Sequence, residues 1–102
     1  MAFDPQQVAL SHHNLANHLR GAAGDIGQIW AHFLAAAVVT YQMGGDISSY
    51  VQLGARPRTT FAEIASIVSE VDGVHLADLV DRLPKRAPDG QAALDEILKL
   101  VG

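Results

Sequence analysis

The sequence predicts an all-α fold, a compact antiparallel bundle of about five to six helices that forms one domain over residues 1–102. Hydrophobic residues make up 49% of the chain, which is enough to build a core. Apolar residues recur at the three- and four-residue spacing of helices, and no stretch of useful length alternates as a strand would. Short breakers rich in Gly, Pro and Asp separate these segments, so we expect neighbouring helices to pack antiparallel.

Capping residues and a broad apolar stripe predict the first two helices. Asp4 is a suitable N-cap, and Pro5 suits the first helical position. The glycines of RGAAGD interrupt the pattern, after which Asp25 can cap a second helix. The apolar stripe of this second helix, the strongest core signal in the chain, consists of Ile26, Ile29, Trp30, Phe33, Leu34, Ala37, Val38 and Tyr41. A single helix from Pro5 to Met43, bent at the glycines, is the alternative interpretation.

Shorter helices are predicted in the second half of the chain. Gly44 ends the long apolar segment, and Asp46 caps a short helical piece, ISSYVQLG. Thr60 and Glu63 form a capping box, and Pro84 halts a later helix. The apolar faces of the last three helices are Phe61, Ile64, Ala65, Val68 and Val71, then Leu76, Leu79, Val80 and Leu83, and finally Leu94, Ile97, Leu98 and Val101.

Composition excludes several kinds of chemistry. The absence of cysteine rules out disulfides and thiolate metal sites, and it favours a reducing compartment, the cytoplasm. A net charge of −4 argues against broad binding to nucleic-acid phosphates. The stretch from Ile26 to Gly45 has no charged residue, but the two glutamines and the histidine within it predict a buried helix and not a membrane span. The N-terminal MAFDPQQ has neither the basic nor the apolar region of a signal peptide.

The histidines do not show the spacing of a metal site. No two of them are four residues apart, and no acidic residue lies beside the three of the first helix. We therefore expect satisfied or solvated side chains at His12, His13, His18, His32 and His75. A nucleophile elbow is absent. Gly21, Gly24 and Gly27 follow no predicted strand, so they indicate helix breaks or close helix packing and not a phosphate loop. The sequence predicts no enzymatic activity, no metal and no other cofactor.

Charged residues are expected to form two patches of opposite sign. Three acid-first pairs at i,i+4 spacing favour a solvated helical face: Asp78 with Arg82, Asp81 with Lys85, and Asp95 with Lys99. The predicted basic patch comprises Arg20, Arg56, Arg58, Arg82, Lys85 and Arg86. The predicted acidic patch comprises Asp46, Glu63, Glu70 and Asp72. Opposite patches on one small domain suit head-to-tail self-association.

One segment resembles a DNA-binding module. FAEIASIVSEVDGVHLADLVDRLPKRA, Phe61 to Ala87, is similar to the helix-turn-helix core of MarR-type regulators. Its second helix would present His75, Asp78 and Asp81, which would repel phosphates. The chain from Pro88 onward also shows a helical pattern where that family has a β-hairpin wing. DNA binding is therefore the less favoured alternative, and we expect no nucleic-acid partner.

A second resemblance starts from LADLVDRLPKRAPDGQAALDEIL, Leu76 to Leu98, which resembles the caspase recruitment domain (CARD) family of the death-fold superfamily. In that family a leucine-proline-basic run ends the fourth helix, and a short apolar helix follows. The matching positions are Leu83, Pro84, Lys85, Arg86 and Pro88 in the connector, and Ala93, Leu94, Ile97 and Leu98 in the helix. Ala87 stands where the family usually has glycine, and Asp46 to Thr60 is longer than expected.

The CARD resemblance implies a death-fold-like domain without catalysis of its own. Such domains self-associate and recruit effectors, a protease among them, in immune or cell-death pathways that include bacterial antiphage defence. It places Arg82, Lys85 and Arg86 on the basic side of the contact, with Arg20 beside them, and acidic residues of the middle helices opposite. A generic helical oligomerisation or adaptor domain is the alternative.

Overall fold

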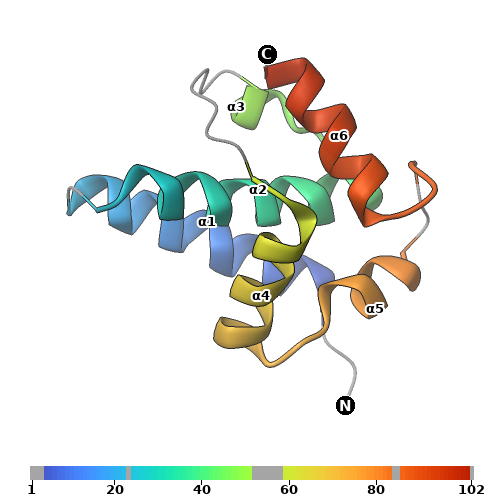
Figure 1. Ribbon diagram of the computed structural model, residues 1–102, viewed down its shortest axis with the longest axis horizontal. Helices are drawn as coiled ribbons and strands as arrows, with labels where there is room; N and C mark the ends of the chain where they lie inside the picture. The colour runs from blue at the N-terminus through green and yellow to red at the C-terminus, as the bar shows by residue number, and fades with distance from the viewer. Residues whose placement is uncertain (1–3, 23, 52–58, 84–85, 102) are drawn as a thin grey trace.

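Two long helices lie side by side and form an antiparallel hairpin (Figure 1). They are α1 (Pro5–Gly21) and α2 (Ile26–Gln42) in a computed structural model that describes residues 4–22, 24–51, 59–83 and 86–101, the last without its side chain. Both helices begin as predicted, because the side chains of Asp4 and Asp25 each accept a hydrogen bond from the backbone of the first turn. Residues 5–43 therefore contain two helices and not one bent helix.

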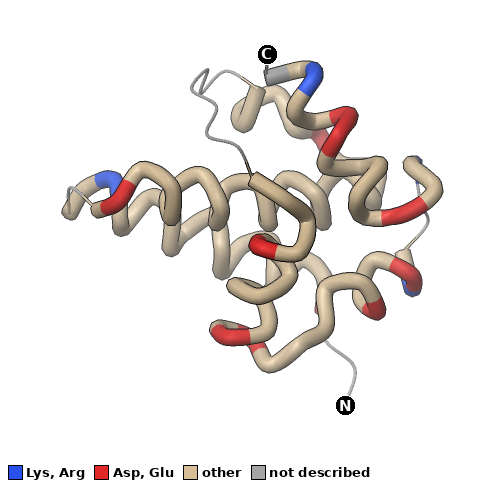
Figure 2. Tube along the Cα trace, in the orientation of Figure 1, with Lys and Arg blue, Asp and Glu red and all other residues tan. Residues whose placement is uncertain are grey.

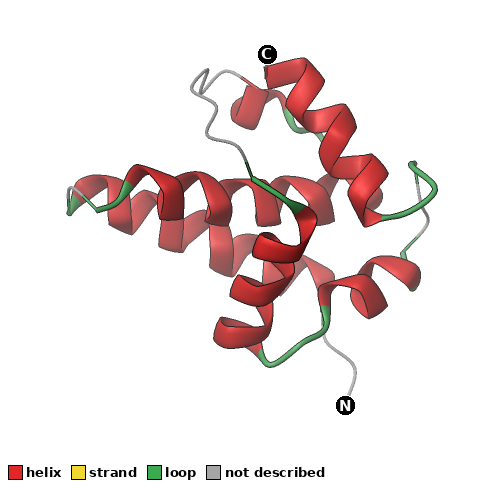
Figure 3. Cartoon of the chain, in the orientation of Figure 1, coloured by secondary structure: helices red, strands yellow, loops and turns green. Residues whose placement is uncertain are grey.

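Four shorter helices complete the fold. They are α3 (Ser48–Val51), α4 (Phe61–Asp72), α5 (Leu76–Asp81) and α6 (Gly90–Val101). Figure 3 shows helices joined by loops, with no strand in the described parts of the chain. The prediction of an all-α bundle with about five to six helices is confirmed.

The helix ends follow the local sequence closely. The Thr60 hydroxyl accepts a hydrogen bond from the Glu63 N–H at 3.2 Å, which is one half of the predicted capping box. Gly44 after α2 and Gly73 after α4 adopt backbone φ values of +84° and +67°, which residues other than glycine rarely adopt. Helix α5 ends at Asp81, earlier than the predicted end at Leu83, and its last residues continue as a turn.

Helix α2 is the centre of the core. Every residue from Trp30 to Val39 is buried, because α1, α4 and α6 pack around it. Small side chains at Ala31 and at 35–37 let these neighbours approach closely. The uncharged stretch is thus a core helix, as predicted, and no helix in the described residues is long and apolar enough to cross a membrane.

One predicted ion pair is replaced by different contacts on α6. Lys99 lies 3.7 Å from the Glu96 carboxylate, one helical turn before it, and not against Asp95. Asp95 instead accepts a hydrogen bond from the Gln91 amide at 3.0 Å. The i,i+3 and i,i+4 spacings both place side chains on one face, so sequence spacing alone does not choose between the two acids. The predicted pair with Lys85 lies outside the described residues.

Candidate functional site

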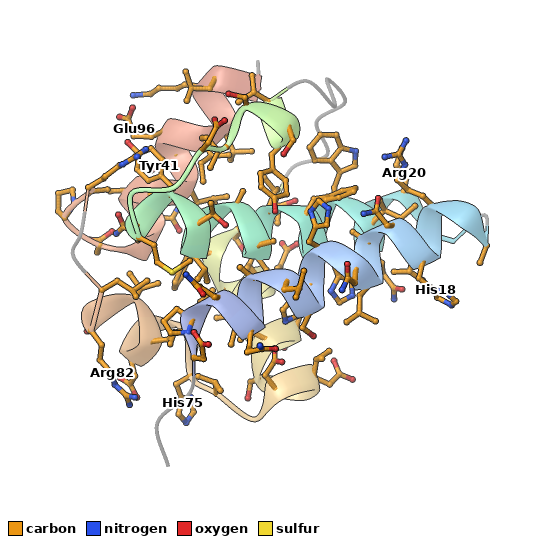
Figure 4. The ribbon with its side chains drawn as sticks, turned by 180° about the vertical axis from the view of Figure 1, so that it is seen from behind. His18, Arg20, Tyr41, His75, Arg82 and Glu96 are labelled. Carbon is orange, nitrogen blue, oxygen red and sulfur yellow. The ribbon has the colours of Figure 1, made fainter. Side chains whose placement is uncertain are left out.

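The predicted basic residues do not gather in one patch. Arg82 follows α5 and is exposed, whereas Arg20 lies near the end of α1. Figure 4 shows these two side chains at opposite ends of the molecule. Arg86 is exposed in the segment before α6. Predicted positions Arg56, Arg58 and Lys85 lie outside the described residues.

The segment from Arg86 to Asp89, here called the basic connector, is fastened to the core by Gln42. Gln42 is the last residue of α2 and is fully buried. Its side-chain oxygen accepts hydrogen bonds from the backbone N–H groups of Arg86 at 3.0 Å and Ala87 at 2.9 Å. Its side-chain nitrogen donates to the carbonyl of Ala87 at 3.3 Å. One amide thus satisfies several backbone groups that would otherwise lack partners.

The Arg86 side chain is oriented as well. Its guanidinium carbon lies 5.1 Å from the centre of the Tyr41 ring, within the range of a cation–π contact. Tyr41 is labelled in Figure 4 and belongs to the same turn of α2 as Gln42. Backbone and side chain of this arginine are therefore both positioned by the end of α2.

Asp46, a predicted member of the acidic patch, lies beside this arginine. Its carboxylate accepts hydrogen bonds from the Ser48 hydroxyl at 2.5 Å and from the Ser48 N–H at 2.9 Å. These bonds, with a smaller contribution from the charge of Arg86, lower the pKa of Asp46 below its usual range. The structure therefore places Asp46 within electrostatic range of a predicted basic residue.

The other predicted acids are on α4, visible in Figure 2 as red segments of that helix. Glu63 and Glu70 are exposed. Asp72 is not: its side chain is 13% exposed and its carboxylate oxygen lies 2.6 Å from His12 Nε2. The structure keeps Glu63 and Glu70 on the surface of α4 and turns Asp72 into the protein.

Asp72 ends a buried chain of three side chains, the His12–His32–Asp72 network. His12 on α1 is fully buried, and its Nδ1 lies 2.8 Å from Nδ1 of His32 on α2. The two imidazole rings stack with centroids 5.1 Å apart. Asp72 is the last residue of α4, so the network joins three helices at one point.

Protonation in this network is constrained by geometry. Two Nδ1 atoms at 2.8 Å form a hydrogen bond only if one of them carries a proton and the other does not. The other nitrogen of His12 donates to the Asp72 carboxylate. Burial is the largest effect on His32 and lowers its pKa, the charge of His12 lowers it further, and Asp72 acts in the opposite direction. His32 is therefore largely neutral at pH 7.

Sequence reasoning anticipated satisfied histidines but missed their partner. His12 and His32 are buried and hydrogen-bonded, so they are the satisfied kind of the two that were expected. Asp72 is 60 residues from His12, so no local spacing connects them. A buried histidine requires a polar partner, but the sequence does not indicate which residue supplies it. Among the described residues, no three His, Asp or Glu side chains could hold a metal.

A groove runs between α2 and α4, next to the network. Its larger part has a volume of about 380 Å³ and its smaller part about 230 Å³. Gln28 and Ile67 line both parts, so the two adjoin each other. We call it the α2–α4 groove; it is lined by Asp25, Gly27, Gln28, Ala31, His32, Thr59, Glu63, Ser66, Ile67, Glu70 and Val71. Three of these side chains are acidic and exposed, and His32 lies at the smaller end.

The segment that resembles a helix-turn-helix contains α4 and α5. Helix α5, which would be the recognition helix, has six residues and carries Asp78 in its first turn. Helix α6 follows it where the resemblance requires a wing.

Comparisons with protein-family models, with curated proteins and with solved structures found no match to this chain.

Proposed function

We propose that the chain is a non-catalytic, CARD-like interaction module that self-associates through its basic connector and recruits an effector. The observation that carries this proposal is the fixed, exposed arginine of the connector. Gln42 holds the Arg86 backbone, and Tyr41 supports its guanidinium. The CARD resemblance supports an effector such as a protease, in a cytoplasmic immune or cell-death pathway.

A positioned arginine is well suited to binding another protein. A mobile arginine loses side-chain entropy when it is immobilised in an interface, at roughly 0.5–1.5 kcal/mol. Here much of that ordering has already occurred, because backbone and guanidinium both have partners within the chain. Arginine and tyrosine are also among the residues that most often carry binding energy in interfaces.

The counterpart of such an arginine is a carboxylate on the partner. Opposite charges across a contact set orientation and raise the rate of encounter. The charge of Arg86 acts on Asp46, but among the described residues no ion pair within 4 Å joins the two, so Asp46 does not occupy the guanidinium. Arg86 and the neighbouring exposed Arg82 remain on the surface.

A different surface favours the alternative, a generic helical oligomerisation domain. Leu10 on α1 is 53% exposed at the edge of a cleft of about 330 Å³. Met43 and Tyr50 also line this cleft. Association through such an apolar surface would be strengthened or unchanged by salt, whereas association through Arg86 would be weakened.

Sedimentation velocity at low and high salt separates the two functions. We expect association at about 0.05 M salt that is lost near 0.5 M, because the Debye screening length between charges falls to a few ångströms. Arg86→Glu should abolish association and keep the helical circular dichroism. Arg20→Glu is the matched control, because Arg20 lies at the other end of the molecule, and it should associate like the wild type. Association that is insensitive to salt and to Arg86→Glu contradicts the proposal.

A further inference from the structure

We infer that the α2–α4 groove receives the basic connector of a second copy of this chain, with the Arg86 guanidinium as the group it binds. This inference rests on the proposed function, because it supplies the acidic half of the same contact. Two independent features of the groove support it: its charge, and a histidine nitrogen that opens into it.

The lining of the groove matches a cation. Asp25, Glu63 and Glu70 are exposed along it, and no lysine or arginine is among the described side chains that line it. Its lining also includes the apolar side chains of Ala31 and Ile67. Carboxylates beside apolar groups suit a guanidinium, which is planar and more weakly hydrated than an ammonium group.

His32 provides a polar group inside the groove. The residue is 9% exposed and lines the smaller end with Glu70. Nδ1 is occupied by His12, and the two nitrogens of an imidazole point in widely different directions. No described residue forms a hydrogen bond with Nε2, yet no described side-chain nitrogen is left both buried and unpartnered. His32 Nε2 therefore reaches solvent in the groove.

The protonation of His32 can adapt to a cation. When His12 is neutral and accepts the Nδ1–H of His32, the Nε2 of His32 carries a lone pair that accepts a hydrogen bond from an N–H donor. An entering guanidinium favours this arrangement, because it supplies such donors. The groove thus offers the carboxylate of Glu70 and an imidazole acceptor at one end.

The connector and the groove are separate surfaces of one chain. The groove involves the first half of α2 and α4, whereas Arg86 lies beside Tyr41 at the end of α2 (Figure 1). A contact between two different surfaces leaves one of each unused on every dimer. Copies would therefore add head to tail, in a ring or a filament.

Two complementary variants test the inference. Arg86→Glu retains an intact groove, and Glu70→Lys retains an intact connector. We expect each variant alone to be monomeric at a concentration where the wild type associates. Mixed in equal amounts, they should form a dimer of twice 10.9 kDa and nothing larger, because each dimer has only one intact surface of each kind and both are used. Sedimentation velocity or light scattering measures the mass.

The controls separate the groove from the proposed function. Glu96→Lys makes the same charge change at an exposed position on α6, no residue of which lines the groove, and should associate like the wild type. If Glu70→Lys associates normally while Arg86→Glu does not, the groove is not the binding site and the proposed function stands. A mixture that stays monomeric also rules out the groove as the binding site. A wild-type chain that stays monomeric at low salt overturns both.

Discussion

Nδ1 of His12 and Nδ1 of His32 lie 2.8 Å apart in the core, so these two rings share a proton across the α1–α2 hairpin. A second proton on this contact would place two N–H donors against each other and break the hydrogen bond. The packing of the hairpin is therefore linked to pH through a pair of side chains that have little contact with solvent.

Stability should fall as the pH drops below about 6.5, the ordinary histidine pKa. The folded-state pKa of His32 is lowered, so between that pKa and 6.5 the unfolded chain binds more protons than the folded chain. The contribution of neutral His32 to the free energy of unfolding is therefore complete above pH 6.5. It decreases as the pH falls from 6.5 to the folded-state pKa of His32. Urea unfolding across this range measures it. His18→Gln, on an exposed residue, should keep the dependence and His32→Gln should reduce it; a wild type with no such fall contradicts this account.

Loss of the central ring should be costly. His12→Ala removes the partner of a carboxylate that is 13% exposed and leaves a cavity, so we expect a loss of about 3–5 kcal/mol of unfolding free energy at pH 7. His18→Ala, on the same helix but exposed, should stay within about 0.5 kcal/mol of the wild type. Chemical denaturation compares them, and similar values for both variants would show that the network contributes little.

The connector should loosen when its amide clamp is removed. Gln42→Leu leaves the N–H groups of Arg86 and Ala87 without their acceptor, and we expect a loss of about 2–4 kcal/mol. Hydrogen exchange at the Ala87 amide should accelerate, whereas Gln42→Glu should retain most of its protection because an acceptor oxygen remains. Gln7→Leu, at an exposed position on α1, is the control. Unchanged exchange in Gln42→Leu would show that the clamp does not order the connector.

Replacement of Gly90 by alanine is expected to destabilise the protein, although alanine usually stabilises a helix relative to glycine. A Cβ at this first residue of α6 would overlap the ring of Phe61, so Gly90→Ala should cost about 1–3 kcal/mol. Gly21 is the last residue of α1, and a Cβ added there would meet no atom within 4 Å. Gly21→Ala should therefore be neutral or stabilising. Phe61→Leu should recover part of the loss in Gly90→Ala. A Gly90→Ala variant as stable as the wild type contradicts the close contact.

Local rules accounted for much of the fold. The caps at Asp4, Asp25 and Thr60 and the stop at Gly44 depend on interactions within a few residues, so the sequence predicts them directly. The apolar stripe of α2 predicted the burial of this helix from Trp30 onward, whereas Ile26 at its start is 61% exposed.

The candidate site was less predictable, because its contacts are long-range. The glutamine that fastens the connector is 44 residues from Arg86, and Asp72 is 60 residues from His12. Grouping charges by sign also failed to anticipate their positions, since the fold places Arg20 far from Arg82 and brings Asp46 near Arg86. Such pairs depend on helix packing and not on residue spacing.

Amide NMR spectra recorded over a dilution series at low salt test the head-to-tail contact most directly. The account predicts concentration-dependent shifts at two separate places, the connector around Arg86 and the groove around Glu70 and His32. The same shifts should disappear in Arg86→Glu at every concentration. Spectra that do not change with concentration, or shifts confined to the cleft beside Leu10, would contradict it.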